Sequence, residues 1–164
     1  MRPEVGPVNG GHHRPAVTPG PGAVKDIVVS AVVMRDAEGH VLNVRKRGTR
    51  MLMLPGGKPE AGEAPAETAL REFREELGIA LDPVALRPVG SFRAAAANEP
   101  DHEVVAHVFE HPYVAGVAVN AEIELLEWVD PAVVRDDMAP LNTEHVFPAL
   151  LAGRGDGPAR AQPR

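Results

Sequence analysis

The residues best placed to do chemistry are carboxylates in the segment GKPEAGEAPAETALREFREELGI, residues 57–79. Glu72, Glu75 and Glu76 follow one another at the spacing i, i+3 and i+4. On an α-helix these three side chains lie along one side. Each like-charged pair costs about a few tenths of a kcal/mol and brings no structural benefit, whereas oxygen ligands that converge on one point are what Mg²⁺ or Mn²⁺ requires. The pattern therefore favours a divalent-metal site over its alternative, a solvated acidic face.

A helix over residues 64–77 is expected to position these carboxylates. Its apolar side chains recur at helical spacing and form a face that packs against a sheet: Ala66, Leu70, Phe73 and Leu77. Gly78 follows the last turn, where a left-handed residue ends a helix. A loop over residues 56–62 precedes this helix.

The rest of the folded part is predicted to form strands, with two more helices near its end. A strand at 26–34, a turn at 36–40 and a strand at 41–47 predict a hairpin, followed by a short strand at 51–55. Two longer strands at 84–94 and 102–114 are joined by a turn at 98–101, and another strand covers 121–130. A short helix is expected at 131–136 and a terminal helix at 141–152, in which Pro148 is awkward. This order predicts an α+β domain with a mixed sheet between helices.

Composition limits the remaining possibilities. The 164 residues suffice for one domain, which we place at residues 25–152, between Pro- and Gly-rich flexible tails at 1–24 and 153–164. The net charge of −6 argues against a nucleic-acid polymer as partner. The absence of cysteine excludes disulfides and thiolate chemistry. No apolar run is long enough to cross a membrane, so we expect a cytoplasmic protein without a membrane partner.

Seven residues share the spacing of a known motif: Gly57, Glu63, Arg71, Glu72, Glu75, Glu76 and Gly78. The segment resembles the Nudix hydrolase signature at every specified position, with Phe73 where an aliphatic residue is commoner. The resemblance is to the MutT-like members of the family. The predicted order of strands and helices extends it over residues 25–152. It implies a Nudix-type α/β/α sandwich with a catalytic loop-helix-loop that holds Mg²⁺, or alternatively Mn²⁺. It also implies hydrolysis of the diphosphate linkage in a nucleoside diphosphate joined to another moiety, such as a modified (d)NTP or ADP-ribose.

The resemblance also assigns roles within the motif. Glu75 and Glu76 are the expected principal metal ligands, and Glu72 is a ligand or an orienting carboxylate. The carbonyl of Gly56 is a further candidate ligand, since glycine lets backbone approach an ion closely. Arg71 is expected to pair with Glu63 and tie the loop to the helix, or alternatively to form only a surface pair. Gly57, Glu63 and Gly78 are expected to be structural.

The motif does not fix the general base, which in the family often comes from a carboxylate elsewhere in the chain. Glu122 precedes the pair Glu127-Trp128 by five residues, as a metal-binding glutamate does in MutT-type members, and we favour it as base and ligand. Glu124, Glu99 and Glu103 are the alternatives.

The substrate has candidate contacts of two kinds. A basic cluster (Arg45, Lys46, Arg47 and Arg50) precedes the metal loop, and we expect Arg45, Arg47 and Lys58 to receive phosphates, although an exposed hairpin end explains the cluster equally well. Asn142 corresponds to an Asn that contacts the purine base in MutT-type members, with helix capping as its alternative. Trp128 and Phe92 could stack on a base or belong to the core.

Two other functions compete with a nucleotide hydrolase. The first is a catalytically silent Nudix-fold nucleotide-binding or regulatory module, but such modules usually lose motif carboxylates and this chain keeps them. The second is prenyl diphosphate isomerisation, which would need a nucleophilic cysteine that the chain lacks. The oligomeric state is left open, with a homodimer as one alternative.

Overall fold

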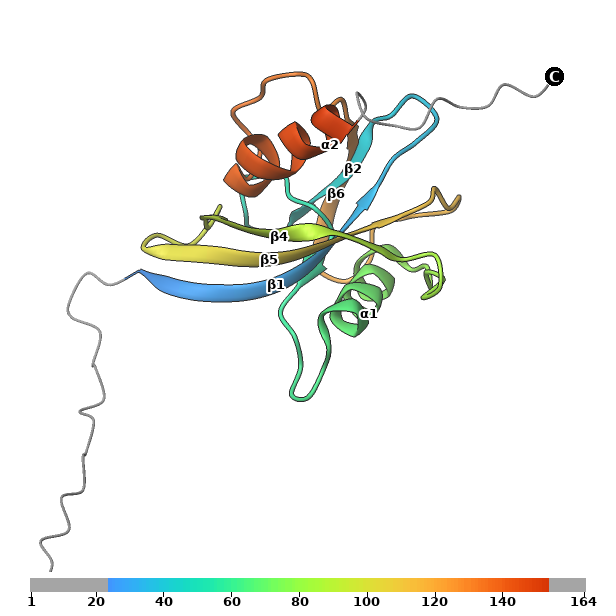
Figure 1. The fold of residues 1–164 in the computed structure, drawn as a ribbon, viewed down its shortest axis with the longest axis horizontal. Coiled ribbons are helices and arrows are strands. Elements are labelled where there is room, and N and C mark those ends of the chain that lie inside the picture. The colour runs from blue at the N-terminus through green and yellow to red at the C-terminus, as the bar shows by residue number, and fades with distance from the viewer. Residues whose placement is uncertain (1–23, 154–164) are drawn as a thin grey trace, which may run out of the picture.

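A four-stranded mixed sheet forms the centre of the molecule in the computed structural model, which describes residues 24–153 (Figure 1). Its strand order is β3-β1-β5-β4, with β1 at Lys25–Met34, β3 at Gly56–Gly57, β4 at Arg87–Ala95 and β5 at His102–His111. β1 is parallel to β5, while the other neighbours are antiparallel. A separate antiparallel pair joins β2 (Val41–Lys46) to β6 (Ile123–Val129). The predicted mixed sheet is confirmed.

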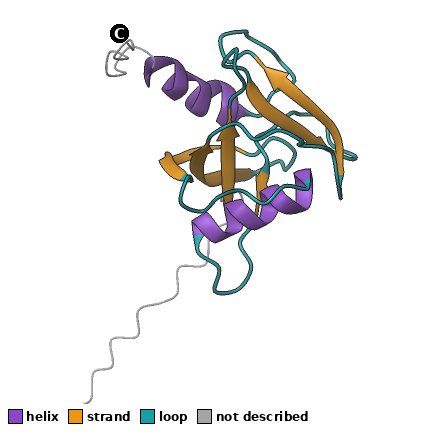
Figure 2. Cartoon of the chain, turned by 90° about the vertical axis from the view of Figure 1, so that its right-hand side faces the viewer, coloured by secondary structure: helices purple, strands orange, loops and turns teal. Residues whose placement is uncertain are grey.

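Helices cover both faces of this sheet, as Figures 1 and 2 show. On one side lies α1, Pro65–Leu77, and on the other lie the π-helix η1, Leu141–Val146, and α2, Phe147–Gly153. Alternate side chains of β1 serve the two sides: Val32 and Met34 pack in the cluster that contains Phe73 of α1, and Val33 packs with Phe147. The α/β/α layering agrees with the expectation.

The predicted hairpin between residues 26–34 and 41–47 is wrong. The turn at 36–40 forms, because Asp36 Oδ1 accepts hydrogen bonds from the backbone N–H groups of Glu38 and His40. Beyond it the strands separate, and only an isolated bridge joins Arg35 to Val41. One edge of β1 pairs with β5 along its full length, and the other edge is bonded to β3 and to the carbonyl of Pro55, so β2 pairs with β6 instead.

Other boundaries also differ from the expectation. Residues 51–55 contribute isolated bridges at Leu52 and Met53 rather than a strand, since the following Pro55 has no N–H to extend a ladder. The strand expected from residue 84 begins at Arg87. No helix forms at 131–136; there Asp130 accepts two backbone hydrogen bonds and closes a turn.

The terminal helix begins as predicted at Leu141 but opens with a π-helical stretch. The N–H of Phe147 bonds to the carbonyl of Asn142, five residues earlier. Pro148 follows at once and cannot donate the next bond, so the wide turn accommodates it. No helix within residues 24–153 has the length and apolarity that a membrane span requires. The predicted tails lie outside the described residues except for Val24 and Gly153.

Candidate active site

Arg71 on α1 connects the loop before the helix to the carboxylates of the helix. Its guanidinium donates to both oxygens of Glu63, at 2.7 and 2.9 Å, and to the carbonyl of Lys58 at 3.0 Å. Another of its nitrogens donates to Glu72 at 2.9 Å and to Glu75 at 3.2 Å. The predicted tie between loop and helix is present, and the i,i+4 pair that was its alternative forms beside it, between Arg71 and Glu75.

Glu63 is the carboxylate of the loop that Arg71 binds. Besides the bonds from Arg71, it accepts a hydrogen bond from the hydroxyl of Thr68 at 2.7 Å and one from the backbone N–H of Glu60 at 3.1 Å. These bonds, with Arg71 the largest contribution, hold the pKa of Glu63 down at about 2. Thr68 is fully buried and was not identified from the sequence, because a threonine inside a helix carries no distinctive pattern.

Three glycines shape the site for steric reasons. A Cβ on Gly56 would lie 2.1 Å from the carbonyl oxygen of Ser30, so only glycine lets this strand approach β1. A Cβ on Gly57 would lie 2.5 Å from the carboxyl carbon of Glu72, so glycine leaves room for that carboxylate. Gly78 ends α1 with φ of 73°, in the left-handed region. These positions agree with the structural roles expected for Gly57 and Gly78.

Glu76 is the most buried of the three helix carboxylates, with 5% of its surface exposed. Its Oε2 accepts a long hydrogen bond, 3.4 Å, from the N–H of Gly56. Its Oε1 has no hydrogen-bond partner within residues 24–153, and Lys46 Nζ lies 3.8 Å away. Burial raises the pKa of Glu76 to about 8, with the nearby charge of Glu72 adding to the effect and Lys46 opposing it.

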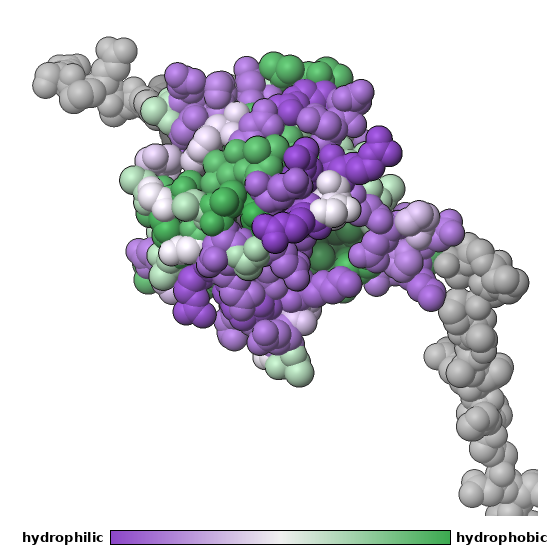
Figure 3. Space-filling model, turned by 180° about the vertical axis from the view of Figure 1, so that it is seen from behind, coloured by the Kyte–Doolittle hydropathy of each residue, from purple (hydrophilic) through white to green (hydrophobic). Residues whose placement is uncertain are grey.

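A cavity of about 590 Å³ opens beside these carboxylates. One end is lined by Glu72, Glu75 and Glu76, and Gly56 lines it as well. Much of the remaining lining is aliphatic, from Ile27, Val29, Met53, Ala95, Ala96, Ala97, Val104 and Leu141. Seen from behind, the molecule exposes apolar surface between strongly hydrophilic groups (Figure 3). The cavity therefore has an acidic end, and most of its remaining lining is aliphatic.

The basic residues divide differently from the prediction. Lys46 and Lys58 line the cavity. Arg45 turns to Glu124, with 3.5 Å between Nε and the carboxylate, and neither Arg45 nor Arg47 is a lining residue. Lys46 therefore occupies the position in the cavity wall that was predicted for Arg45 and Arg47. Strand alternation gave no reliable signal here, because the β2–β6 ladder shifts register between Arg45 and Lys46 and Arg47 lies beyond the end of β2.

Of the four candidates for the base, two remain free to act in the cavity. Glu122 and Glu99 line it, whereas Glu124 pairs with Arg45 and Glu103 accepts a hydrogen bond from Arg93 at 2.7 Å. The role of Glu122 stays a prediction, and its position in the wall agrees with it.

Asn142 does not line the cavity, although its neighbour Leu141 does. Its side chain is fully buried and donates to Asn43 Oδ1 at 2.7 Å. The capping alternative is wrong, because the helix starts after Pro140 without a side-chain cap. The predicted purine contact stays untested, and the burial of the side chain does not favour it.

The aromatic candidates also lie elsewhere. Trp128 packs against Tyr113, with ring centroids 5.7 Å apart, and Phe92 lies 6.2 Å from the ring of His145. Neither Trp128 nor Phe92 lines the cavity.

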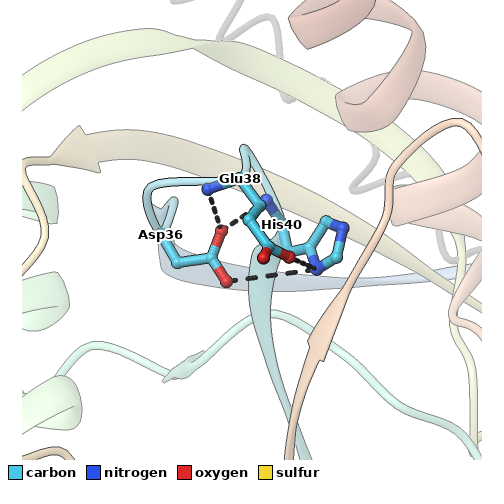
Figure 4. Close-up of side chains that lie close together, drawn as sticks. All are labelled: Asp36, Glu38 and His40. Atoms are coloured by element: carbon cyan, nitrogen blue, oxygen red, sulfur yellow. Dashed lines mark hydrogen bonds and ion pairs between the residues drawn. The ribbon is translucent and has the colours of Figure 1, made fainter.

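A second group of potential ligands lies in the turn between β1 and β2 (Figure 4). His40 Nδ1 approaches Glu38 at 3.6 Å and Asp36 at 4.0 Å. The backbone N–H groups of Glu38 and His40 donate to Asp36, which explains this arrangement as a turn. None of the three residues lines the cavity.

Comparison with known proteins identifies the family. The model of the NUDIX domain matches residues 25–150. The chain belongs to the Nudix family. Its likeness to the uncharacterized Nudix hydrolase YvcI of Bacillus subtilis is 28% identity over 130 residues, 78% of this chain and 80% of that protein. The chain is also 34% identical over 116 residues, 67% of its length, to an octanoyltransferase of Myxococcus xanthus, but spans only 32% of that protein.

The fold agrees with that assignment. The crystal structure of a MutT protein from Methanosarcina mazei Go1 superposes with a TM-score of 0.65 at 24% identity, covering 82% of this chain and 98% of that one. The predicted membership and the Nudix fold are therefore confirmed. Nudix hydrolases generally act on nucleoside-diphosphate-linked compounds, and membership of the family indicates that this chain is a pyrophosphohydrolase.

Proposed function

We propose that this chain hydrolyses the diphosphate linkage of a nucleoside diphosphate joined to a further moiety, with Mg²⁺ or Mn²⁺ held by its helix carboxylates. The substrate class includes modified (d)NTPs and nucleotide sugars such as ADP-ribose, and one product is a nucleoside monophosphate or another phosphorylated fragment. The observation that carries the proposal is Glu76 Oε1, a buried oxygen with no hydrogen-bond partner among residues 24–153, at the acidic end of a cavity that is otherwise largely apolar.

The donor set fits a hard divalent cation. Glu72, Glu75 and Glu76 line one end of the cavity together with Gly56, and Glu122 faces the same space. Carboxylate and carbonyl oxygens are the ligands that Mg²⁺ prefers. Without a cation, burial favours the protonated form of Glu76. A bound cation would supply positive charge that stabilises the ionised carboxylates and screens the diphosphate.

The other residues have distinct tasks in this proposal. Lys46 and Lys58 are placed to bind phosphate oxygens, since both line the cavity. Arg71 holds Glu72 and Glu75 and thereby fixes their orientation. A carboxylate oxygen of Glu122 accepts the proton of the attacking water. The aliphatic walls exclude bulk water from the organic moiety.

Turnover measurements test the proposal. The wild type, Glu75→Gln and Glu67→Gln are assayed for phosphate or nucleoside monophosphate release from ADP-ribose, (d)NTPs and oxidised (d)NTPs, each with Mg²⁺, with Mn²⁺ and with EDTA. Glu67 is exposed on α1 and does not line the cavity. We expect metal-dependent release by the wild type and Glu67→Gln, and its loss in Glu75→Gln. Equal turnover by Glu75→Gln, or activity that EDTA leaves intact, would contradict the proposal.

A further inference from the structure

The cavity has a far end that is well separated from the carboxylates of α1. At the near end Ala31 pairs with Gly56, and at the far end Ile27 pairs with Val104; all four residues line the cavity. Ile27 and Ala31 are four positions apart along the strand, which is about 13 Å at the usual rise. A nucleotide with its diphosphate at the acidic end would therefore extend its base toward Ile27.

The β4–β5 loop closes this far end. Ala95 pairs with Glu103, and the backbone N–H of Lys25 at the start of β1 donates to the carbonyl of Asp101 in the loop at 3.1 Å. From this loop Asn98 and Glu99 line the cavity. No hydrogen bond or ion pair occupies the Glu99 carboxylate among residues 24–153, whereas the nearby Glu103 is held by Arg93. Glu99 is thus an acidic group facing the cavity and open to a ligand.

The chemistry of this end restricts what can bind there. A carboxylate repels phosphate and, when ionised, only accepts hydrogen bonds, through two adjacent oxygens. The aliphatic side chains of Ile27, Val29 and Val104 suit the flat faces of a base better than the hydroxyls of a sugar. A base edge with two neighbouring N–H donors satisfies both requirements, as the N1–H and 2-amino groups of guanine do. Adenine offers one donor beside an acceptor.

We infer that Glu99 selects nucleotides whose base presents the paired N–H donors of guanine. The inference rests on the proposed function, because it assumes that the diphosphate lies at the acidic end. Asn98 beside it contributes an amide that can contact the neighbouring carbonyl of the same base.

Substitution of Glu99 tests the inference, because it should change which base the protein prefers. Guanine, inosine, xanthine and adenine nucleotides with the same phosphate linkage are compared by kcat/KM, and the corresponding monophosphates are compared by Kd in EDTA. Inosine lacks the 2-amino group, so the wild type should favour guanine over inosine by about tenfold, the effect of one hydrogen bond to a charged group. Glu99→Gln replaces one acceptor by a donor and should favour xanthine, which has a carbonyl at that position, over guanine. Glu67→Gln removes the same charge away from the cavity and should keep the wild-type order.

The outcomes separate this inference from the proposed function. If the wild type hydrolyses nucleotides but does not distinguish guanine from inosine, or if Glu99→Gln keeps the wild-type order, the role of Glu99 is refuted and the proposed function stands. If no nucleotide is hydrolysed while the monophosphates follow the predicted order in Kd, the proposed function fails and the base selection stands. Selection by the sugar, with ribose favoured over deoxyribose and no dependence on the base, also refutes the inference.

Discussion

Glu76→Gln should stabilise the metal-free protein at alkaline pH while it removes metal-dependent hydrolysis. The carboxyl of Glu76 is buried, and its pKa rises from 4.5 to about 8. Between these values the folded protein binds more protons than the unfolded chain, so the free energy of unfolding falls as pH increases. Glutamine is neutral in both the folded and the unfolded state, so the variant does not lose stability in this way as pH rises.

The magnitude follows from the two pKa values. The stabilising effect of the protonated group is fully present below pH 4.5 and is lost as pH rises through 8. The shift from 4.5 to about 8 lowers the free energy of unfolding by at most about 5 kcal/mol above pH 8 and by at most about 3 kcal/mol at pH 7. Water that penetrates to the carboxylate reduces both values. Glu76→Gln should therefore match the wild type near pH 5 and exceed it by a few kcal/mol near pH 9.

Urea unfolding in EDTA at several pH values measures this difference. Glu75→Gln is the matched control, because its side chain is half exposed, and it should follow the wild-type curve. Addition of Mg²⁺ at pH 9 should stabilise the wild type but not Glu76→Gln. Parallel stability curves for the wild type and Glu76→Gln from pH 5 to 9 would refute the claim that Glu76 is buried at a cost that a cation relieves.

Three further substitutions give separate outcomes. Gly57→Ala should keep the fold but weaken Mg²⁺ binding at least about tenfold, since its Cβ would displace the Glu72 carboxylate; unchanged affinity by calorimetry would contradict this. Lys46→Met should raise KM for the nucleotide about tenfold while Arg45→Met leaves it near the wild-type value; equal effects in steady-state kinetics would restore the arginine assignment. Glu63→Gln should be less stable than the wild type above pH 4.5, with the difference vanishing as pH falls toward 2, because the lowered pKa contributes stability only when the carboxylate is ionised; thermal unfolding across this range that shows a constant difference would argue against it.

The motif helix could be predicted almost to the residue because its signals are local. Its apolar spacing, Pro65 at its start and Gly78 at its end all lie within one segment. Strand partners were not predictable in the same way. The turn at 36–40 is local and formed as expected, but the partner of β2 is β6, about 80 residues later.

In the candidate site, too, the features with local sequence signals were predictable and those that depend on strand pairing were not. The pairing of Arg71 with Glu63 follows from a motif that fixes their separation. The choice of Lys46 over Arg45 depends on which side of β2 faces the cavity, which the strand partner decides. Glu99 reaches the cavity only because β4 and β5 place their loop at the end of β1, and no spacing in the sequence contains that information.

Metal titration with proton counting tests the central claim most directly. Mg²⁺ or Mn²⁺ is added to the metal-free protein by calorimetry at pH 7 in buffers of different ionisation enthalpy, with and without nucleotide. Because Glu76 is largely protonated there, binding should release about one proton per site, and Glu76→Gln should bind weakly without proton release. Failure of both ions to bind the wild type even with nucleotide present, or binding that is unchanged in Glu76→Gln, would contradict the account.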